Sequence, residues 1–187
     1  MIGNFKGVVY MLNLFTPNYY IHRYDALRVE YLKEHGIELL LCDIDNTLVP
    51  HDVADADAEA KAFLKKILDA NIQIVFVSNN VEERVARFAK CFDLPYYHFA
   101  LKPLPITYLK ALKDFGYKGK NKQKVAVLGD QMMTDVLGSK LCGLHVILTN
   151  QVVERDLTCT KWNRKLENMM FYLLKKFKKL ERGVYDE

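Results

Sequence analysis

The stretch Leu39-Leu40-Leu41-Cys42-Asp43-Ile44-Asp45-Asn46-Thr47 decides the fold, because in it an apolar run ends in two carboxylates and a hydroxyl. A short apolar run that stops at a polar turn is typical of a strand buried on both faces of a parallel sheet. Side chains two positions apart on a strand share a face, so we expect Asp43 and Asp45 to point into the same space, about 7 Å apart along the chain. Acids this close repel each other unless a cation lies between them or one holds a proton, and a magnesium site with a nucleophile and a proton donor meets both conditions.

Three later segments repeat this pattern of an apolar run that ends in polar residues. Residues with helical spacing lie between the runs, and alternating strands and helices form a parallel sheet with right-handed crossovers. Such sheets bind ligands at the carboxyl ends of their strands. We therefore expect a single Rossmann-like α/β domain with a parallel five-stranded sheet flanked by helices. The runs and their polar residues are 72–77 with Ser78-Asn79-Asn80, 96–101 with Lys102-Pro103, and 125–128 with Gly129-Asp130 and, five positions later, Asp135.

Each of these residues also has a plain structural role open to it. The DxDxT stretch could be an ordinary turn, because Asp and Asn tolerate turn geometry. Ser78 could cap the helix that follows it, and Asp135 could cap a short helix that runs to Leu141. Lys102 could be an ordinary solvated lysine. The DxDxT stretch, Ser78, Lys102 and Asp135 occur together near strand ends, and this combination favours a catalytic site.

The order DxDxT, Ser, Lys, GDxxxxD resembles the haloacid dehalogenase superfamily of phosphotransferases over about residues 37–149. This resemblance implies that Asp43 is the nucleophile that becomes an aspartyl-phosphate. It implies that Asp45 is the acid that protonates the leaving oxygen and later activates water. Phosphoryl transfer needs little covalent chemistry from a protein and much charge neutralisation, which suits this set of residues.

The same resemblance implies a phosphate site and a metal site. Ser78 and the amides at Asn79 would cradle the phosphate, and Lys102 would offset the charge on the transferring group. Asp130, with Asp43 and the backbone carbonyl of Asp45, would hold Mg²⁺. Asp135 would be either a further metal ligand or a support for the ligands. The full metal set is thus Asp43, Asp45, Asp130 and Asp135.

The spacing between the motifs leaves no room for a cap domain. From Thr47 to Ser78 there is space for one turn, one helix and one strand, and from Ser78 to Lys102 for one more helix and strand. We therefore expect an open site without a cap. Selectivity then depends on the bulk of the substrate itself, which could be a protein, a nucleic acid, a membrane surface or a second subunit.

The last part of the chain is basic and amphipathic, and we expect a helix over residues 160–182 after a catalytic core over 37–150. Between Lys161 and Arg182 there are eight basic and two acidic residues, so the net charge of this tail is +6. The whole chain carries only +4. Its apolar positions form one helical stripe. Such a helix suits the surface of an anionic bilayer, but it could equally be a final helix packed on the sheet.

The segment before residue 37 holds an apolar stretch up to Phe15 and a predicted helix over Asp25–His35. The apolar stretch is shorter than the roughly 20 residues that a transmembrane helix needs. We expect it to cover the sheet. The four cysteines form no CxxC pair, and strand alternation turns Cys42 away from the site, so we interpret them as reduced core thiols of a cytoplasmic protein.

Within the superfamily, CDIDNTLVPHD and GDQMMTDVLGSKLCG are similar to the YqeG-type proteins and the phosphatidylglycerophosphate phosphatases. That resemblance implies a phosphatase of an anionic phospholipid at a membrane surface, peripheral on the inner face of the membrane, with no nucleic acid as partner. Two alternatives stay open. One is a phosphatase of a soluble sugar phosphate or nucleotide. The other is a non-catalytic RNA-binding module, since lysine clusters attract any polyphosphate.

Overall fold

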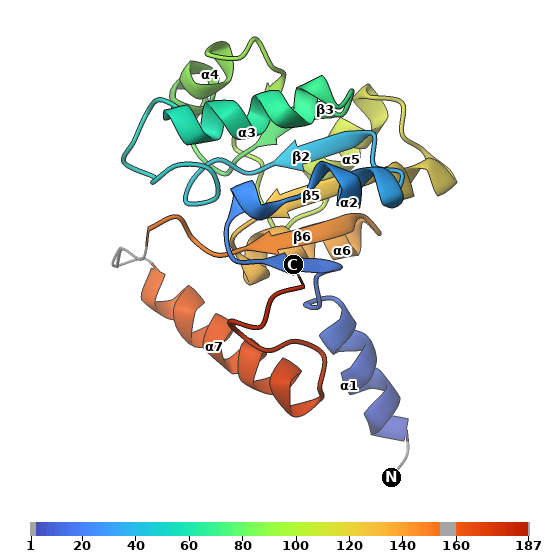
Figure 1. Ribbon diagram of the computed structural model, residues 1–187. Coiled ribbons are helices and arrows are strands. Elements are labelled where there is room, and N and C mark those ends of the chain that lie inside the picture. The colour runs from blue at the N-terminus through green and yellow to red at the C-terminus, as the bar shows by residue number, and fades with distance from the viewer. Residues whose placement is uncertain (1–2, 154–159, 187) are drawn as a thin grey trace.

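The computed structural model, which describes residues 3–153 and 160–186, has one parallel six-stranded sheet with helices on both faces (Figure 1). The order of the strands is β1-β6-β5-β2-β3-β4, and every neighbouring pair is parallel. β2 and β5 lie at the centre and consist of buried side chains, as the apolar run predicts. The strands are β1 (Tyr19–Ile21), β2 (Leu39–Cys42), β3 (Gln73–Val77), β4 (Tyr96–Tyr97), β5 (Val125–Gly129) and β6 (His145–Thr149).

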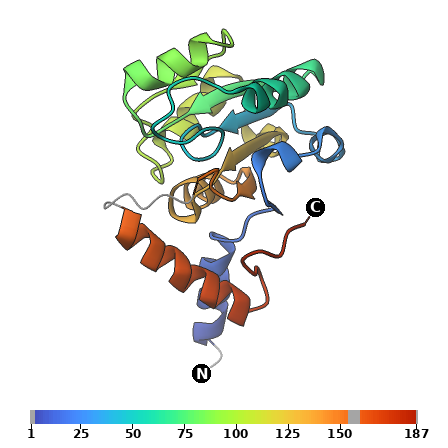
Figure 2. The ribbon, with the colours of Figure 1, turned by 60° about the vertical axis from the view of Figure 1, so that its left-hand side comes forward.

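The helices form two layers that enclose the sheet (Figures 1 and 2). The buried side chains of α2, α3 and α4 pack on one face. α5 packs on the other face beside β2 and β3, and α1 and α7 pack there at the end that β1 and β6 form. The helical segments are α1 (Gly3–Asn13), η1 (Tyr24–Ala26), α2 (Val29–Glu34), α3 (Ala58–Asp69), α4 (Glu82–Lys90), α5 (Ile106–Asp114), η2 (Gly119–Lys124), η3 (Met132–Val136), α6 (Leu137–Leu141) and α7 (Thr160–Lys176).

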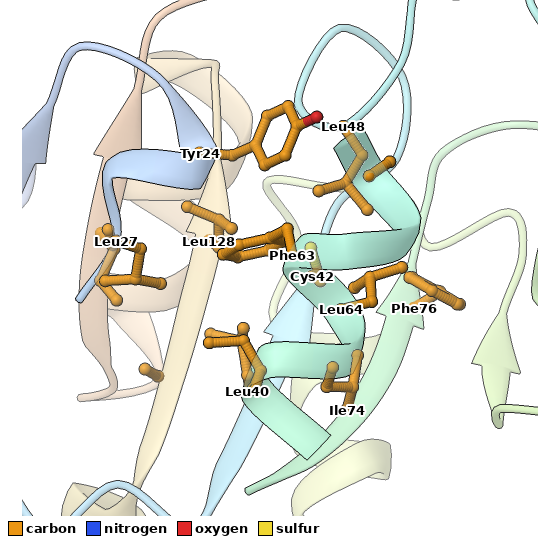
Figure 3. Packing of buried hydrophobic residues seen from close by; sticks show 14 of the residues in the cluster. Tyr24, Leu27, Leu40, Cys42, Leu48, Phe63, Leu64, Ile74, Phe76 and Leu128 are labelled. Carbon is orange, nitrogen blue, oxygen red and sulfur yellow. The ribbon is translucent and has the colours of Figure 1, made fainter. Parts of the chain in front are cut away.

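α3 shows how sequence spacing becomes core packing. The Asp57 carboxylate caps the helix by accepting a hydrogen bond from the Ala60 amide at 2.7 Å. Side chains three and four positions apart share a face of a helix, so Phe63 and Leu64 lie on the same face as Ala60. This face is turned toward the sheet (Figure 3). Each fully buried side chain of this size contributes about 1.5–3 kcal/mol. Their neighbours in the sheet are Leu40, Cys42, Ile74, Phe76 and Leu128.

The expected fold class is confirmed, but the predicted number of five strands is wrong. The sixth strand is β1, in the segment before the core, where three residues are too few to give a periodic pattern. The strand expected over residues 96–101 is also shorter and ends at Tyr97. The strand does not extend further because Phe99 and Leu101 adopt the left-handed backbone conformation, with φ of 42° and 56°. A strand requires a negative φ at each residue.

The other expected segments are present with changed bounds. The predicted helix over Asp25–His35 is a short turn, η1, followed by α2. β2 connects to β3, and β3 to β4, through one loop and one helix each, so these described connections contain no cap domain. Among the described residues, no helix combines the length and the apolarity needed to cross a bilayer.

The C-terminal helix ends at Lys176 rather than at Arg182, and Lys178 adopts left-handed backbone with φ of 54°. The chain then returns to the sheet, where the Asp186 amide donates to the Tyr20 carbonyl at 2.8 Å. α7 does pack on the core, because Met170 and Leu174 are buried beside Leu12 of α1. The side chains of Lys161 and Arg164, which belong to the predicted basic tail, and Cys159 lie outside the described residues.

Candidate active site

The predicted site residues follow the carboxyl ends of β2, β3, β4 and β5, and parallel strands such as β2 and β5 point the same way in Figure 1, so these residues come together at one end of the sheet. Asp43 continues the ladder by one residue beyond β2, since its amide donates to the Leu128 carbonyl at 2.9 Å. Asp130 follows β5 directly, and Asp135 lies in the π-helical turn η3. All three aspartates are buried, at 6%, 6% and 2% exposure.

Lys102 lies among these acids and is buried, so the alternative of a solvated lysine is wrong. Its Nζ is 2.6 Å from Oδ1 of Asp43 and 2.7 Å from Oδ1 of Asp135. Asn79 fixes the backbone of Lys102 on both sides, accepting from its amide at 2.7 Å and donating to its carbonyl at 3.1 Å. The side chain of Asn79 therefore holds Lys102 in position through both of these hydrogen bonds.

Thr47 links two of the acids, a contact that we did not predict although the DxDxT pattern contains this residue. Its hydroxyl lies 3.0 Å from Oδ2 of Asp43 and 3.1 Å from Oδ1 of Asp130. A hydroxyl has one proton, so it can donate to only one ionised carboxylate at a time. The contact holds the two carboxylates side by side.

The electrostatics of this cluster favour an additional positive charge. Burial raises the pKa of Asp43 to about 7, although Lys102 lowers it and Asp135 raises it further. Burial and the neighbouring charge of Asp43 raise the pKa of Asp130 well above its usual value. Burial alone would lower the pKa of Lys102, but Asp135 and Asp43 outweigh it and raise that pKa. One ammonium thus faces three acids, and a divalent cation would balance them.

The donor set fits such a cation. Asp43, Asp130 and Asp135 each offer an oxygen within 4.8 Å of the others. Oδ2 of Asp130 is buried and has no hydrogen-bond partner among the described residues. Buried polar atoms normally have partners, so this oxygen is placed for a ligand. Carboxylate oxygens are the ligands that hard cations such as Mg²⁺ prefer.

Asp45 lies beside this cluster with a different set of partners. Its Oδ2 accepts from Oγ of Ser78 at 3.2 Å and from the side-chain amide of Asn80 at 3.1 Å. Its Oδ1 accepts from Nε of Arg84 at 2.8 Å. We did not predict Arg84, because its contact depends on the direction of α4, which the sequence does not give.

The two capping alternatives are also wrong. Ser78 does not cap α4, whose N-cap is Val81; its hydroxyl accepts from the Asn80 amide at 3.1 Å. Asp135 does not cap α6, whose N-cap is Val136. Instead Oδ2 of Asp135 accepts from the Gln131 amide at 3.2 Å, which leaves Oδ1 for Lys102.

Comparisons with known proteins identify the family. A family model described as haloacid dehalogenase-like hydrolase matches residues 18–143. The chain is 32% identical to "Probable phosphatase YqeG" of Bacillus subtilis (strain 168), over 87% of this chain and 92% of that protein. A solved haloacid dehalogenase superfamily (subfamily III A) hydrolase from Legionella pneumophila is similar in fold, with a TM-score of 0.50, 20% identity, and coverage of 79% of this chain and 89% of that one.

Proposed function

The chain belongs to the haloacid dehalogenase-like hydrolase family, and from this premise we propose that it is a magnesium-dependent phosphatase that dephosphorylates phosphatidylglycerophosphate. The observation that carries the proposal is the buried cluster of Asp43, Asp130 and Asp135 around Lys102. A cluster of this kind has no use in a binding module. It suits a reaction in which charge is neutralised on a transferring phosphoryl group.

Asp43 and Asp45 divide the covalent and the proton-transfer work in this proposal. Asp43 attacks phosphorus, so that a carboxylate O–P bond forms while the bond from phosphorus to the leaving oxygen breaks. Asp45 gives its proton to that leaving oxygen. In the second half, Asp45 takes a proton from water, and the hydroxide that results releases phosphate from Asp43. Ser78, Asn80 and Arg84 hold the Asp45 carboxylate for both steps.

Lys102 and the metal neutralise charge. Two hydrogen bonds from Nζ go to Asp43 and Asp135, and an ammonium has three protons, so one proton remains for a phosphate oxygen. In this proposal Ser78 and the backbone amide at Asn79 bind the phosphate. Asp43, Asp130, Asp135 and the backbone carbonyl of Asp45 would hold Mg²⁺, which when bound polarises the phosphoryl oxygens and offsets the charge of the acids.

Two features support a lipid substrate, beside the resemblance to the phosphatidylglycerophosphate phosphatases. The connections from β2 to β4 leave the site without a cap. The helices α1 and α7 also expose large apolar side chains, and the last turn of α7 carries Lys175 and Lys176, a combination that suits an anionic bilayer. We therefore propose that the enzyme is cytoplasmic and binds peripherally to the inner face of the membrane. The exposed apolar side chains are Val8, Tyr10, Met11, Leu166, Met169 and Tyr172.

The proposal is tested by phosphate release from phosphatidylglycerophosphate in mixed micelles with Mg²⁺, beside a panel of soluble sugar phosphates and nucleotides. Asp43→Asn serves as the matched control, because it keeps the shape of the side chain. We expect fast release from the lipid and a loss of at least about 1,000-fold in the variant. Release from soluble esters alone would remove the lipid assignment, and residual activity above that level would require another nucleophile.

A further inference from the structure

We propose that the cavity between the end of β6, α7 and the C-terminal segment is the pocket for the leaving group, and that it accepts a hydroxylated group carrying a second phosphate, which Arg182 binds. This inference rests on the proposed function and names the part of the substrate that the same site would recognise. The cavity has a volume of about 530 Å³. Asp130, one member of the acidic cluster, lies in its lining, so the cavity borders that cluster.

The walls of the cavity come from parts of the chain that are far apart in sequence. Asn150 and Gln151 follow the carboxyl end of β6, Asn168 lies on α7, and Arg182 lies in the segment that returns to the sheet. Figures 1 and 2 show how α7 and this returning segment lie beside the edge that β1 and β6 form. Most of this lining lies outside residues 18–143, which match the family model. The pocket is therefore a property of the C-terminal part of this chain.

The lining of the cavity includes neutral polar groups that hydrogen bonds hold in place. The Tyr20 hydroxyl donates to Oδ1 of Asn150 at 2.7 Å, and Nδ2 of Asn150 donates to the Tyr185 hydroxyl at 2.7 Å. This chain of hydrogen bonds sets the orientation of the Asn150 amide before a ligand arrives. Amides and hydroxyls that are already oriented suit the hydroxyl groups of a polyol, because little ordering remains to be done.

The lining also carries a positive charge, that of Arg182. The Arg182 guanidinium donates to Oδ1 of Asn168 at 2.8 Å, and it lies 4.5 Å from the centroid of the Phe171 ring. Both partners are neutral, so these contacts position the guanidinium without neutralising it. A guanidinium has five N–H donors in a planar fork that matches phosphate. Glu167 also lines the cavity, where the Met132 amide fixes its carboxylate by donating to Oε1 at 2.8 Å.

The lining thus combines Asp130 of the acidic cluster, oriented neutral polar groups and the Arg182 guanidinium. In this proposal the phosphate to be cleaved lies at the acidic cluster, with the metal and Lys102. The neutral polar groups receive hydroxylated carbon, and Arg182 receives the second anion. A phospholipid headgroup with two phosphates joined by glycerol has this form, and so does a sugar bisphosphate.

Soluble substrates test the pocket separately from the membrane. We would compare kcat/KM for the deacylated headgroup, which holds two phosphates joined by glycerol, with kcat/KM for glycerol 3-phosphate, which lacks the second phosphate. Fructose 1,6-bisphosphate forms a third arm and separates the two sources of the same chemistry. We expect the wild type to prefer the two-phosphate headgroup by about tenfold or more, which corresponds to one charge-assisted contact.

Arg182→Gln should reduce this preference to about unity, mainly through KM, and Arg182→Lys should restore part of it because the charge returns without the fork. Lys118→Gln, at an exposed residue before η2, which leads to the amino end of β5, is the matched control and should keep the wild-type preference. If Arg182→Gln does not fold, as judged by thermal unfolding, Arg182→Lys carries the comparison. The proposed pocket would be rejected if the wild type did not prefer the two-phosphate headgroup, or if the variants at Arg182 kept the full preference.

Calorimetry separates this outcome from a failure of the proposed function. The deacylated headgroup should bind to Asp43→Asn protein, and the double variant with Arg182→Gln should bind it about tenfold more weakly. Binding without turnover in the wild type would reject the phosphatase proposal and keep the pocket. Equal binding by both proteins would reject the pocket whatever the activity.

Discussion

Gly129 and Asp135 approach so closely that a Cβ on Gly129 would lie 2.3 Å from Cγ of Asp135. Only a residue without a side chain can end β5 here, because the Asp135 carboxyl group occupies that space on its way to Lys102. We predict that Gly129→Ala displaces Asp135 and lowers kcat about 100-fold, the cost of moving a site group by about 1 Å. Phosphate release checks this. Gly7→Ala in α1, where a Cβ meets nothing within 4 Å, should keep full activity.

Removing the buried ammonium should destabilise the protein. Lys102→Met leaves Asp43 and Asp135 buried without their cation, and we expect a loss of about 3–5 kcal/mol in the free energy of unfolding, together with loss of activity. Urea denaturation measures it. Lys65→Met, which breaks an exposed pair with Asp69, should change stability by less than about 0.5 kcal/mol. Equal effects of the two variants would contradict the role of burial.

Arg84 should matter through Asp45. Arg84→Gln removes the guanidinium that holds Oδ1 of Asp45, so we expect kcat to fall about tenfold, part of what a positioned general acid contributes. The comparison is Arg87→Gln in the same helix, whose partner Asp55 is exposed and outside the site. Steady-state kinetics on one soluble ester are enough, and an equal kcat for both variants would remove Arg84 from the mechanism.

Metal binding should stabilise the fold through the acidic cluster. Because Oδ2 of Asp130 is buried without a partner, we expect millimolar Mg²⁺ to raise Tm and EDTA to reverse the increase. A protein that binds at 100 times its Kd gains about 2.7 kcal/mol. Asp130→Asn should abolish the shift measured by differential scanning fluorimetry, whereas Asp69→Asn on the surface of α3 should not. A shift that survives Asp130→Asn would place the metal elsewhere.

The free energy of unfolding should depend on pH through His145, which lies outside the acidic cluster. Burial lowers its pKa from 6.5 to about 4, and the charges of His35 and Lys140 act in the same direction. Its contribution is therefore complete above pH 6.5 and is lost as the pH falls toward 4. After a discount for partial exposure we expect a loss of about 1–2 kcal/mol. Urea denaturation at several pH values should show this loss in the wild type and not in His145→Gln; the same slope in both would reject it.

The sequence predicted the parts of the site that follow from strand alternation. The apolar run before Asp43 defines the central strand, and the polar residues after β3 and β5 fall at the same edge for a purely topological reason. Cys42 packs in the core beside Leu40, on the side away from Asp43, as a period of two requires.

The remaining features depend on side-chain direction and on segments too short to show a period. The contact of Arg84 with Asp45 requires the orientation of α4 over the loop after β2. The Thr47 bridge requires the positions of two carboxylates from different strands. β1 has three residues, so neither alternation nor length distinguished it from a loop.

The pairing of β1 also has a consequence for synthesis of the chain. β1 is made before the other strands of this sheet, but its partner is β6, with Tyr19 opposite Ile147. At about 5–20 residues per second, a ribosome needs on the order of ten seconds to reach that partner. Its other neighbour, Asp186, follows later still. Of the strands in this sheet, the first to leave the exit tunnel is therefore among the last to be paired, and we expect nascent chains that stop before β6 to depend on chaperones to keep Tyr19 and Tyr20 from aggregating.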